Sequence, residues 1–126
     1  MFITISENNP VPLYRQIVEQ VTRQIILGEL RAGDPLPSIR QLAKELTTSV
    51  ITTKRAYQEL ERAGYIYTRP GKGSFVAPLS PEKIESFKRE VVREHLQQAV
   101  KAANKVGLEK RVIRELLEEV MEGDTE

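Results

Sequence analysis

Residues 36–76, LPSIRQLAKELTTSVITTKRAYQELERAGYIYTRPGKGSFV, decide the fold of this chain. Near their start, Ser38 is followed three residues later by Gln41, the spacing of a capping box, in which two side chains satisfy each other's backbone N–H groups at a helix start. Apolar residues then recur at helical spacing through Leu46, and the threonines at 47 and 48 are expected to end the helix. The sequence therefore predicts a short helix with one buried face.

Another helix is predicted between Ser49, a favourable N-cap residue, and Gly64, which suits the left-handed conformation that often follows a helix. Advancing each position by about 100° divides this helix into two faces. The face expected to be core contains Thr53, Ala56, Tyr57 and Leu60. The face expected to be a working surface contains Ile51, Thr52, Arg55, Gln58 and Arg62. We expect Val50 to be buried; a rotation of the helix that also buries Ile51 is the alternative.

Beyond this helix, residues 65–69 alternate aromatic and smaller side chains, and residues 74–77 resume the pattern of a strand. Between them, Pro70-Gly71-Lys72-Gly73 is typical of a turn. The sequence therefore predicts a β-hairpin with a glycine-lysine-glycine tip.

Further elements are predicted on both sides of this stretch. Residues 1–5 have the composition of a short strand. Pro10 and Pro12 suit a helix start, and the apolar side chains that follow at four-residue spacing predict a helix that ends at Gly28. From Pro81 onward the pattern predicts a long amphipathic helix, interrupted at Gly107 and followed by a second one.

Three helices followed by a hairpin describe a winged helix-turn-helix. We therefore predict a mostly α fold with a small β-hairpin: a winged helix-turn-helix DNA-binding domain over residues 1–78, and a two-helix C-terminal dimerisation tail over residues 79–126. In such a domain the third helix enters the major groove with its N-terminal turn. The second helix begins at the phosphate backbone, and the hairpin tip reaches the backbone or the minor groove.

Charge is distributed unevenly along the chain. Nineteen basic against eighteen acidic residues give a net charge of +1. Residues 37–76 hold seven basic and three acidic side chains, a net +4, while residues 1–36 carry −1 and residues 77–126 carry −2. Because neutralising the phosphate backbone supplies much of the affinity of proteins for DNA, this local charge favours a nucleic-acid partner.

The composition excludes most enzyme chemistries. The chain has no cysteine and one histidine, His95, so disulfides, thiol catalysis and His/Cys metal sites are not expected. We predict a protein that is not an enzyme, with no catalytic residue, no metal and no cofactor. Neither a targeting segment nor a membrane span is recognisable, so a cytoplasmic protein is expected.

Four motifs in this order resemble the GntR family of bacterial transcription regulators. They are Pro12-Leu13-Tyr14 with Gln16-Ile17, Leu36 to Arg40 with Leu42-Ala43, Lys54 to Tyr57 with Leu60-Glu61 and Gly64, and Gly71 to Val76. The Ala56-Tyr57 pair, the Ser38-Ile39-Arg40 variant and the short helical tail are similar to the YtrA-like subfamily, whose two-helix tail forms a dimer. One departure is Val50-Ile51, where the family usually has a polar residue, an arginine or a Pro-Asn pair. An arginine-to-guanine contact is therefore not carried over to these two positions.

The resemblance implies that Ser38 and Arg40 bind operator phosphates, that Ser49, Thr52 and Arg55 act at the start of the recognition helix, and that the wing is Gly71 to Gly73. From its helical phase, we expect Ile51 to contact a thymine methyl group. The complete set of predicted DNA-binding residues is Ser38, Arg40, Ser49, Ile51, Thr52, Lys54, Arg55, Arg69, Gly71, Lys72 and Gly73. For Arg69, pairing with a carboxylate is the alternative.

An apolar stripe that protrudes from a domain with its own closed core needs a partner, and a second copy of the chain supplies one. The predicted dimerisation residues are Ile84, Phe87, Val91, Ala99, Ala103, Val106, Val112, Leu116, Leu117 and Val120.

Together these features predict a sequence-specific transcription regulator, a repressor that binds a palindromic double-stranded DNA operator as a homodimer. A winged-helix module that docks protein or RNA is the alternative, which salt dependence and sequence discrimination separate. The tail is too short to enclose an effector pocket within one subunit, so any effector would bind between subunits or between the tail and the winged domain. The sequence does not identify an effector.

Overall fold

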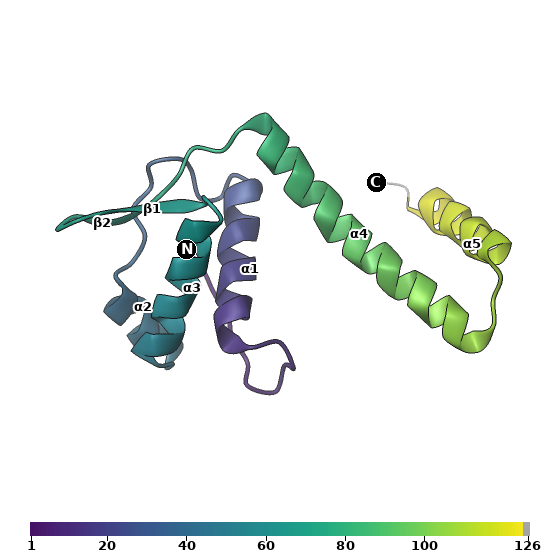
Figure 1. Ribbon diagram of the computed structural model, residues 1–126, viewed down its shortest axis with the longest axis horizontal. Helices are drawn as coiled ribbons and strands as arrows, with labels where there is room; N and C mark the ends of the chain where they lie inside the picture. Colours follow the sequence, from purple (N-terminus) through teal and green to yellow (C-terminus); the bar gives the residue numbers. More distant parts are fainter. Residues whose placement is uncertain (125–126) are drawn as a thin grey trace. The chain divides into compact units, whose positions relative to one another are not determined.

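The computed structural model describes residues 1–124 of a chain that divides into two compact units, Met1–Ile84 and Glu85–Glu126 (Figure 1). We call the first unit the head and the second the C-terminal unit. The elements in chain order are α1 (Leu13–Ile26), α2 (Ile39–Leu46), α3 (Val50–Arg62), β1 (Ile66–Arg69), β2 (Gly73–Val76), α4 (Pro81–Val106) and α5 (Lys110–Gly123).

The head contains one hydrophobic core, built where α1 packs along α3 and both meet the hairpin. Its buried members are Ile17, Val21, Ile25, Leu30, Leu36, Leu42, Ala56, Tyr57, Leu60, Ile66 and Val76. The four-residue spacing on α1 therefore marks its buried stripe, as the sequence predicts. The face of α3 that carries Ala56, Tyr57 and Leu60 is core, which confirms the predicted division of that helix.

Caps define the short α2 and its connection to α3. The Ser38 hydroxyl accepts a hydrogen bond from the Gln41 backbone N–H at 3.1 Å, and α2 ends before Thr47, whose φ of 54° is left-handed. The capping box is only half formed, because the Gln41 side chain donates to Glu45 at 3.2 Å instead. The Tyr57 hydroxyl donates to the Pro37 carbonyl at 2.7 Å, which ties the start of α2 to α3.

The predicted hairpin is present as β1 and β2, which pair antiparallel with Ile66 opposite Val76 and Arg69 opposite Gly73. Residues 33–36 add a third extended segment along β2. Gly33 donates to the Val76 carbonyl at 2.8 Å, and Leu36 donates to the Ser74 carbonyl at 2.9 Å. The wing is thereby anchored to the connection that precedes α2.

The strand predicted at residues 1–5 is wrong. This segment is extended, but its backbone partners are glutamine side chains of α1 rather than another strand. Each amide accepts from and donates to the backbone of one residue of the segment, and the pairs are Gln24 with Phe2, Gln20 with Thr4 and Gln16 with Ser6. The Gln16 amide also donates to the Val11 carbonyl at 2.8 Å. Four-residue spacing on the helix matches two-residue spacing on the extended chain, since both advance by about 6 Å.

The C-terminal unit contains the remainder of α4 and all of α5. Helix α4 ends where Gly107 adopts a φ of 77°, and Leu108 donates back to the Ala103 carbonyl at 2.9 Å. Within residues 85–124, Ala103 is the one buried residue. No helix of the described chain, residues 1–124, combines the length and apolar character that crossing a bilayer requires.

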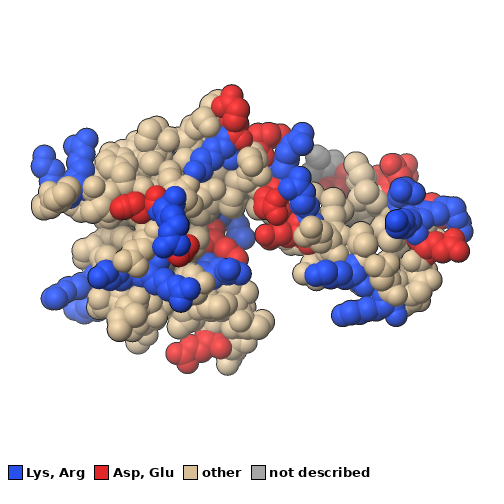
Figure 2. Space-filling view, in the orientation of Figure 1, with Lys and Arg blue, Asp and Glu red and all other residues tan. Residues whose placement is uncertain are grey.

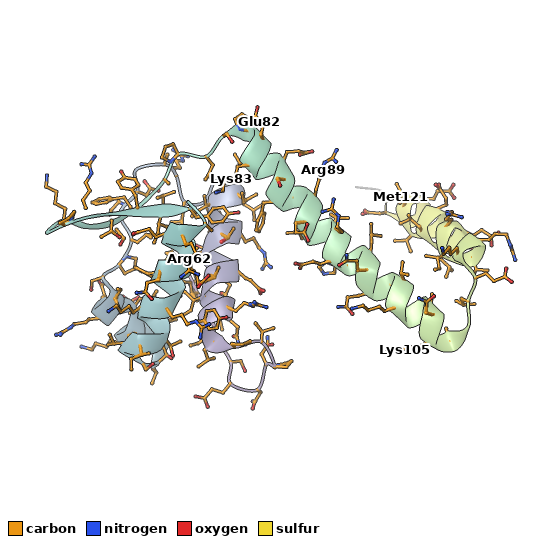
Figure 3. The ribbon with its side chains drawn as sticks, viewed as in Figure 1. Arg62, Glu82, Lys83, Arg89, Lys105 and Met121 are labelled. Atoms are coloured by element: carbon orange, nitrogen blue, oxygen red, sulfur yellow. The ribbon has the colours of Figure 1, made fainter. Side chains whose placement is uncertain are left out.

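The first turn of α4 belongs to the head and is fixed there by Lys83. Its ammonium group donates to the Ala63 carbonyl at the end of α3 and lies 4.8 Å from the centre of the Tyr65 ring (Figure 3). Gly64 leaves room for this side chain, because a Cβ atom at that position would lie 2.9 Å from the ammonium nitrogen.

Candidate nucleic-acid interface

The first turn of α3 projects two apolar side chains into solvent. Ile51 is 81% exposed and Val50 is 47% exposed. The exposure of Ile51 rules out the rotated helix, since the buried face of α3 lies on the side of Thr53 and Tyr57. The prediction that Val50 is buried is wrong, because the core contacts of α3 begin at Thr53.

Predicted DNA-binding residues lie at the starts of α2 and α3. Ser38 and Arg40 are both exposed at the N-terminus of α2. At the start of α3, the Ser49 hydroxyl accepts from the Thr52 backbone N–H at 3.0 Å and donates to the Thr52 hydroxyl at 2.9 Å. Helix N-termini carry partial positive charge and are suited to anions, so both ends can receive a phosphate oxygen.

The wing presents basic side chains on a constrained turn. Gly71 and Gly73 have φ values of 75° and 108°, a backbone conformation that residues other than glycine rarely adopt. Lys72 is exposed between them. Arg69 has no carboxylate partner among residues 1–124 and instead lies 5.7 Å from the Tyr67 ring centre. The alternative that Arg69 pairs with a carboxylate is therefore wrong for residues 1–124.

Basic side chains cluster on the head. Figure 2 shows lysine and arginine side chains at the tip of the hairpin and over α2 and the N-terminal part of α3. Lys54 and Arg55 are both exposed on α3. The basic residues predicted from the sequence are thus exposed on α2, on α3 and on the hairpin of the head.

Tyr14 is a residue of this surface that the sequence did not assign to DNA binding. The guanidinium carbon of Arg55 lies 3.9 Å from the centre of the Tyr14 ring. Tyr14 is partly buried and packs against the core from the first turn of α1. The available signal was its place in the Pro12-Leu13-Tyr14 motif, which gives no indication of a contact with α3.

The buried hydroxyl of Tyr57 has a structural role in the head. Burial, with a smaller contribution from Glu45, raises the pKa of Tyr57 well above its usual range, so its hydroxyl remains a hydrogen-bond donor. In the part of the chain described here, no three His, Cys, Asp or Glu residues are grouped to hold a metal ion.

The predicted dimerisation residues form a second surface. Those that are exposed are Val91, Ala99, Val106, Leu116, Leu117 and Val120, and those that are partly exposed are Ile84, Phe87 and Val112. Ala103 is buried within the single chain, and Ile84 belongs to the head. Exposed apolar residues that the sequence did not assign include Val92, Leu96, Val100, Leu108 and Met121.

Between α4 and α5 these residues line an open apolar groove of about 790 Å³. Its lining includes Leu96, Val100, Ile113, Leu116 and Leu117, with Lys110 and Arg114 as the basic members. Within one chain, nothing in residues 85–124 fills this groove.

Known proteins resemble this chain in the head and over nearly its whole length. The family described as bacterial regulatory proteins, gntR family, matches residues 13–76. The HTH-type transcriptional repressor YtrA of Bacillus subtilis is 31% identical over 118 residues, which cover 94% of this chain and 91% of YtrA. The HTH-type transcriptional regulator YhcF of the same organism is 36% identical over 112 residues, which cover 89% of this chain and 92% of YhcF.

The fold is shared with a solved GntR family transcriptional regulator from Listeria monocytogenes. The TM-score is 0.72 at 30% sequence identity, over 91% of this chain and 98% of that protein. The fold, the family match and relatives of nearly equal length agree on one assignment. The chain belongs to the gntR family and is a transcription regulator with a DNA-binding winged helix-turn-helix, not an enzyme.

Proposed function

We propose that this chain is a cytoplasmic repressor that binds a palindromic operator as a homodimer. The observation that carries the proposal is the exposed first turn of α3, on a head that also exposes basic side chains at the start of α2 and on the wing. The similarity to YtrA, which is named a transcriptional repressor, supports the direction of regulation. Residues 1–78 bind DNA in this proposal, and residues 79–126 form the dimer.

In this proposal, phosphate contacts position the head on the duplex. Ser38 and Arg40 bind phosphate oxygens at the start of α2, and Ser49 and Thr52 do so at the start of α3. Lys72, with Arg69 and the glycines of the turn, contacts the backbone or the minor groove. Such contacts fix orientation but carry no sequence information.

Sequence information in this proposal comes from the exposed side of α3. Ile51 is almost fully solvated and has no apolar partner to cover it, so it gains by burial against a thymine methyl group in the major groove. Lys54 and Arg55 follow on the same helix and supply charge to the groove and its rims. A family member with arginine near the cap would read guanine there, whereas this chain presents an aliphatic side chain.

Dimerisation in this proposal covers the apolar surface of the C-terminal unit. The groove between α4 and α5 is lined mainly by aliphatic side chains, and leucines that stay solvated lose the stabilisation of burial. A second copy, related by a two-fold axis, covers the same surface on both chains. Two recognition helices are then available for two half-sites, which is why a palindrome is expected.

The operator is identified by selecting bound duplexes from a random pool and footprinting the protein on the enriched sequences. We expect a site with two-fold symmetry whose affinity falls steeply with salt. Arg40→Ala should reduce the slope of log affinity against log salt by about 1, since each neutralised phosphate contributes about that much. Arg93→Ala is the matched control, because Arg93 lies in the C-terminal unit and pairs with Glu90 at 2.7 Å. A selected site without symmetry contradicts the homodimer.

Base readout by Ile51 is tested with Ile51→Ala on the selected operator and on single-base variants of it. We expect a loss of about 1 kcal/mol, the value of roughly one to two buried methylene groups, at one A·T position only. Leu27→Ala is the control, since Leu27 is also exposed in the head but lies at the end of α1. An equal loss on every sequence contradicts the readout.

The alternative function is a winged-helix module that docks protein or RNA. It predicts no enrichment of any duplex, and equal affinity for a duplex and for its scrambled version. The same selection experiment therefore decides between the two.

A further inference from the structure

Arg55 is the one recognition-helix arginine that a second element of the head holds in place. Its guanidinium lies over the ring of Tyr14, 3.9 Å from the ring centre, within the range of a cation–π contact. Tyr14 is itself fixed, because it packs against the core from the first turn of α1. A long, flexible side chain on an exposed helix face is thereby given one preferred direction.

The contact leaves the hydrogen-bonding groups of Arg55 unused. Four other arginines of the described chain, Arg62, Arg89, Arg93 and Arg111, pair with glutamates. No carboxylate of residues 1–124 pairs with Arg55. Stacking engages the face of the guanidinium, whereas its five N–H donors project from its edge and remain available to a ligand.

We propose that Tyr14 is a positioning residue that holds Arg55 so that its edge reads a guanine in the major groove. The inference rests on the proposed function, in which α3 is the recognition helix of an operator-binding protein. Arginine bonding to O6 and N7 of guanine is the commonest specific contact of this kind, and it needs two donors in a fixed plane. A side chain that is already ordered loses less freedom on binding.

The position of Arg55 agrees with base contact. It lies one helical turn after Ile51, on the same exposed side of α3, and the N-terminal part of a recognition helix is the part that meets base edges. Val50 and Ile51, in the first turn of α3, have apolar side chains without a donor for guanine. Arg55, supported from α1, therefore supplies guanine recognition from the following turn.

The test compares Tyr14→Leu, Tyr14→Phe and Arg55→Ala on the operator selected by the wild-type protein and on all its single-base variants. Leucine keeps apolar volume but removes the ring, so we expect about 3- to 10-fold weaker binding. Phenylalanine keeps the ring and should stay within about twofold of wild type. The loss in Tyr14→Leu should vanish on the duplex in which the guanine read by Arg55 is replaced.

A double-substitution cycle separates positioning from a structural effect. In the Arg55→Ala background, Tyr14→Leu should cause no further loss, and its thermal unfolding should show whether the fold is kept. Tyr67→Leu is the matched control, since Tyr67 is also partly buried beside an arginine, at 5.7 Å, but lies in the wing. It should leave the preference for that guanine unchanged.

Arg55→Lys provides a second variant that leaves α1 and the core intact. Lysine keeps the charge but not the planar pair of donors, so discrimination at the guanine should fall while salt dependence stays the same. An unchanged preference in Arg55→Lys, unchanged or tighter binding in Tyr14→Leu, or an equal loss on all sequences overturns the inference, the last because it indicates a phosphate contact. A wild-type protein without any sequence preference would instead overturn the proposed function.

Discussion

The head and the C-terminal unit both contain amphipathic helices, but the apolar faces are buried in the head and exposed in the C-terminal unit. In the head, the apolar stripe of α1 is buried against α3, and Ile17, Val21 and Leu60 are fully covered. In the C-terminal unit, the stripes of α4 and α5 stay largely solvated, with Val106 at 74% and Val120 at 69% exposure. Met121, labelled on α5 in Figure 3, is exposed as well.

The difference shows what an amphipathic pattern specifies. It predicts that a helix has a face to bury, but not whether the partner is in the same chain. The head supplies its own partner because three helices and a hairpin enclose one core. Two helices alone do not enclose one, so in the proposed function a second copy of the chain completes the C-terminal unit.

The largest expected effect comes from breaking the surface of the C-terminal unit. Leu116→Glu with Leu117→Glu should abolish dimerisation, with at least about 1000-fold weaker self-association, because each buried leucine is worth about 1.5–3 kcal/mol and both copies are affected. Sedimentation equilibrium over a range of protein concentrations measures the change.

The matched control is Leu27→Glu, which places the same charge at an exposed leucine of the head. It should leave the self-association constant unaltered. Equal weakening by the two proteins, or a wild-type chain that is monomeric at every concentration, contradicts the contrast between the units.

A substitution in the closed core should behave differently. Leu60→Ala removes a fully buried side chain and should lower the free energy of unfolding of the head by about 2–5 kcal/mol. This loss should not depend on protein concentration, whereas that of Leu116→Ala should. Urea unfolding at two concentrations tests both, and a concentration-dependent loss for Leu60→Ala counts against a self-sufficient head.

Much of the fold could be predicted because it depends on local signals. The Ser38 and Ser49 caps, the stripe of α1 and the glycine turn of the wing each have a short-range cause, and each is where the sequence places it. The segment at residues 1–5 could not be predicted, since glutamines on a helix carry no sign that their amides replace a neighbouring strand.

The candidate site was predictable to a lesser degree. Helical phase correctly indicated that Ile51 is exposed, because the core face of α3 is unambiguous. The exposure of Val50 depends on how far α3 extends beyond its last core contact, which is a tertiary property. The contact between Tyr14 and Arg55 joins residues forty-one positions apart, and its formation depends on how α1 and α3 pack.

The junction between α2 and α3 offers a smaller effect that has a pH signature. Tyr57→Phe removes the hydrogen bond to Pro37 and leaves that carbonyl without its donor, so stability should fall by about 1–2 kcal/mol at neutral pH. Burial raises the pKa of Tyr57 in the folded state, so its contribution is present below the ordinary tyrosine pKa of about 10 and is lost as pH rises above it. Stability of the wild type should therefore fall from about pH 10 upward more steeply than that of Tyr57→Phe. Parallel curves would contradict this account.

The smallest expected effect concerns the amide pairs that hold residues 1–6 on α1. Gln20→Ala removes both hydrogen bonds to Thr4, of 2.9 and 2.6 Å, but these are solvent-exposed, so global stability should fall by less than about 1 kcal/mol. Local opening of residues 1–6 should increase more, because the Gln20–Thr4 pair lies between the other two pairs, those of Gln16 and Gln24. Amide hydrogen exchange at Thr4 should accelerate while exchange at the core residues of α1 stays constant.

Gln58→Ala, at an exposed glutamine of α3, is the control that should change neither. Unchanged exchange at Thr4 would mean that packing of Ile3 and Ile5 against the core, rather than the amide pairs, holds this segment.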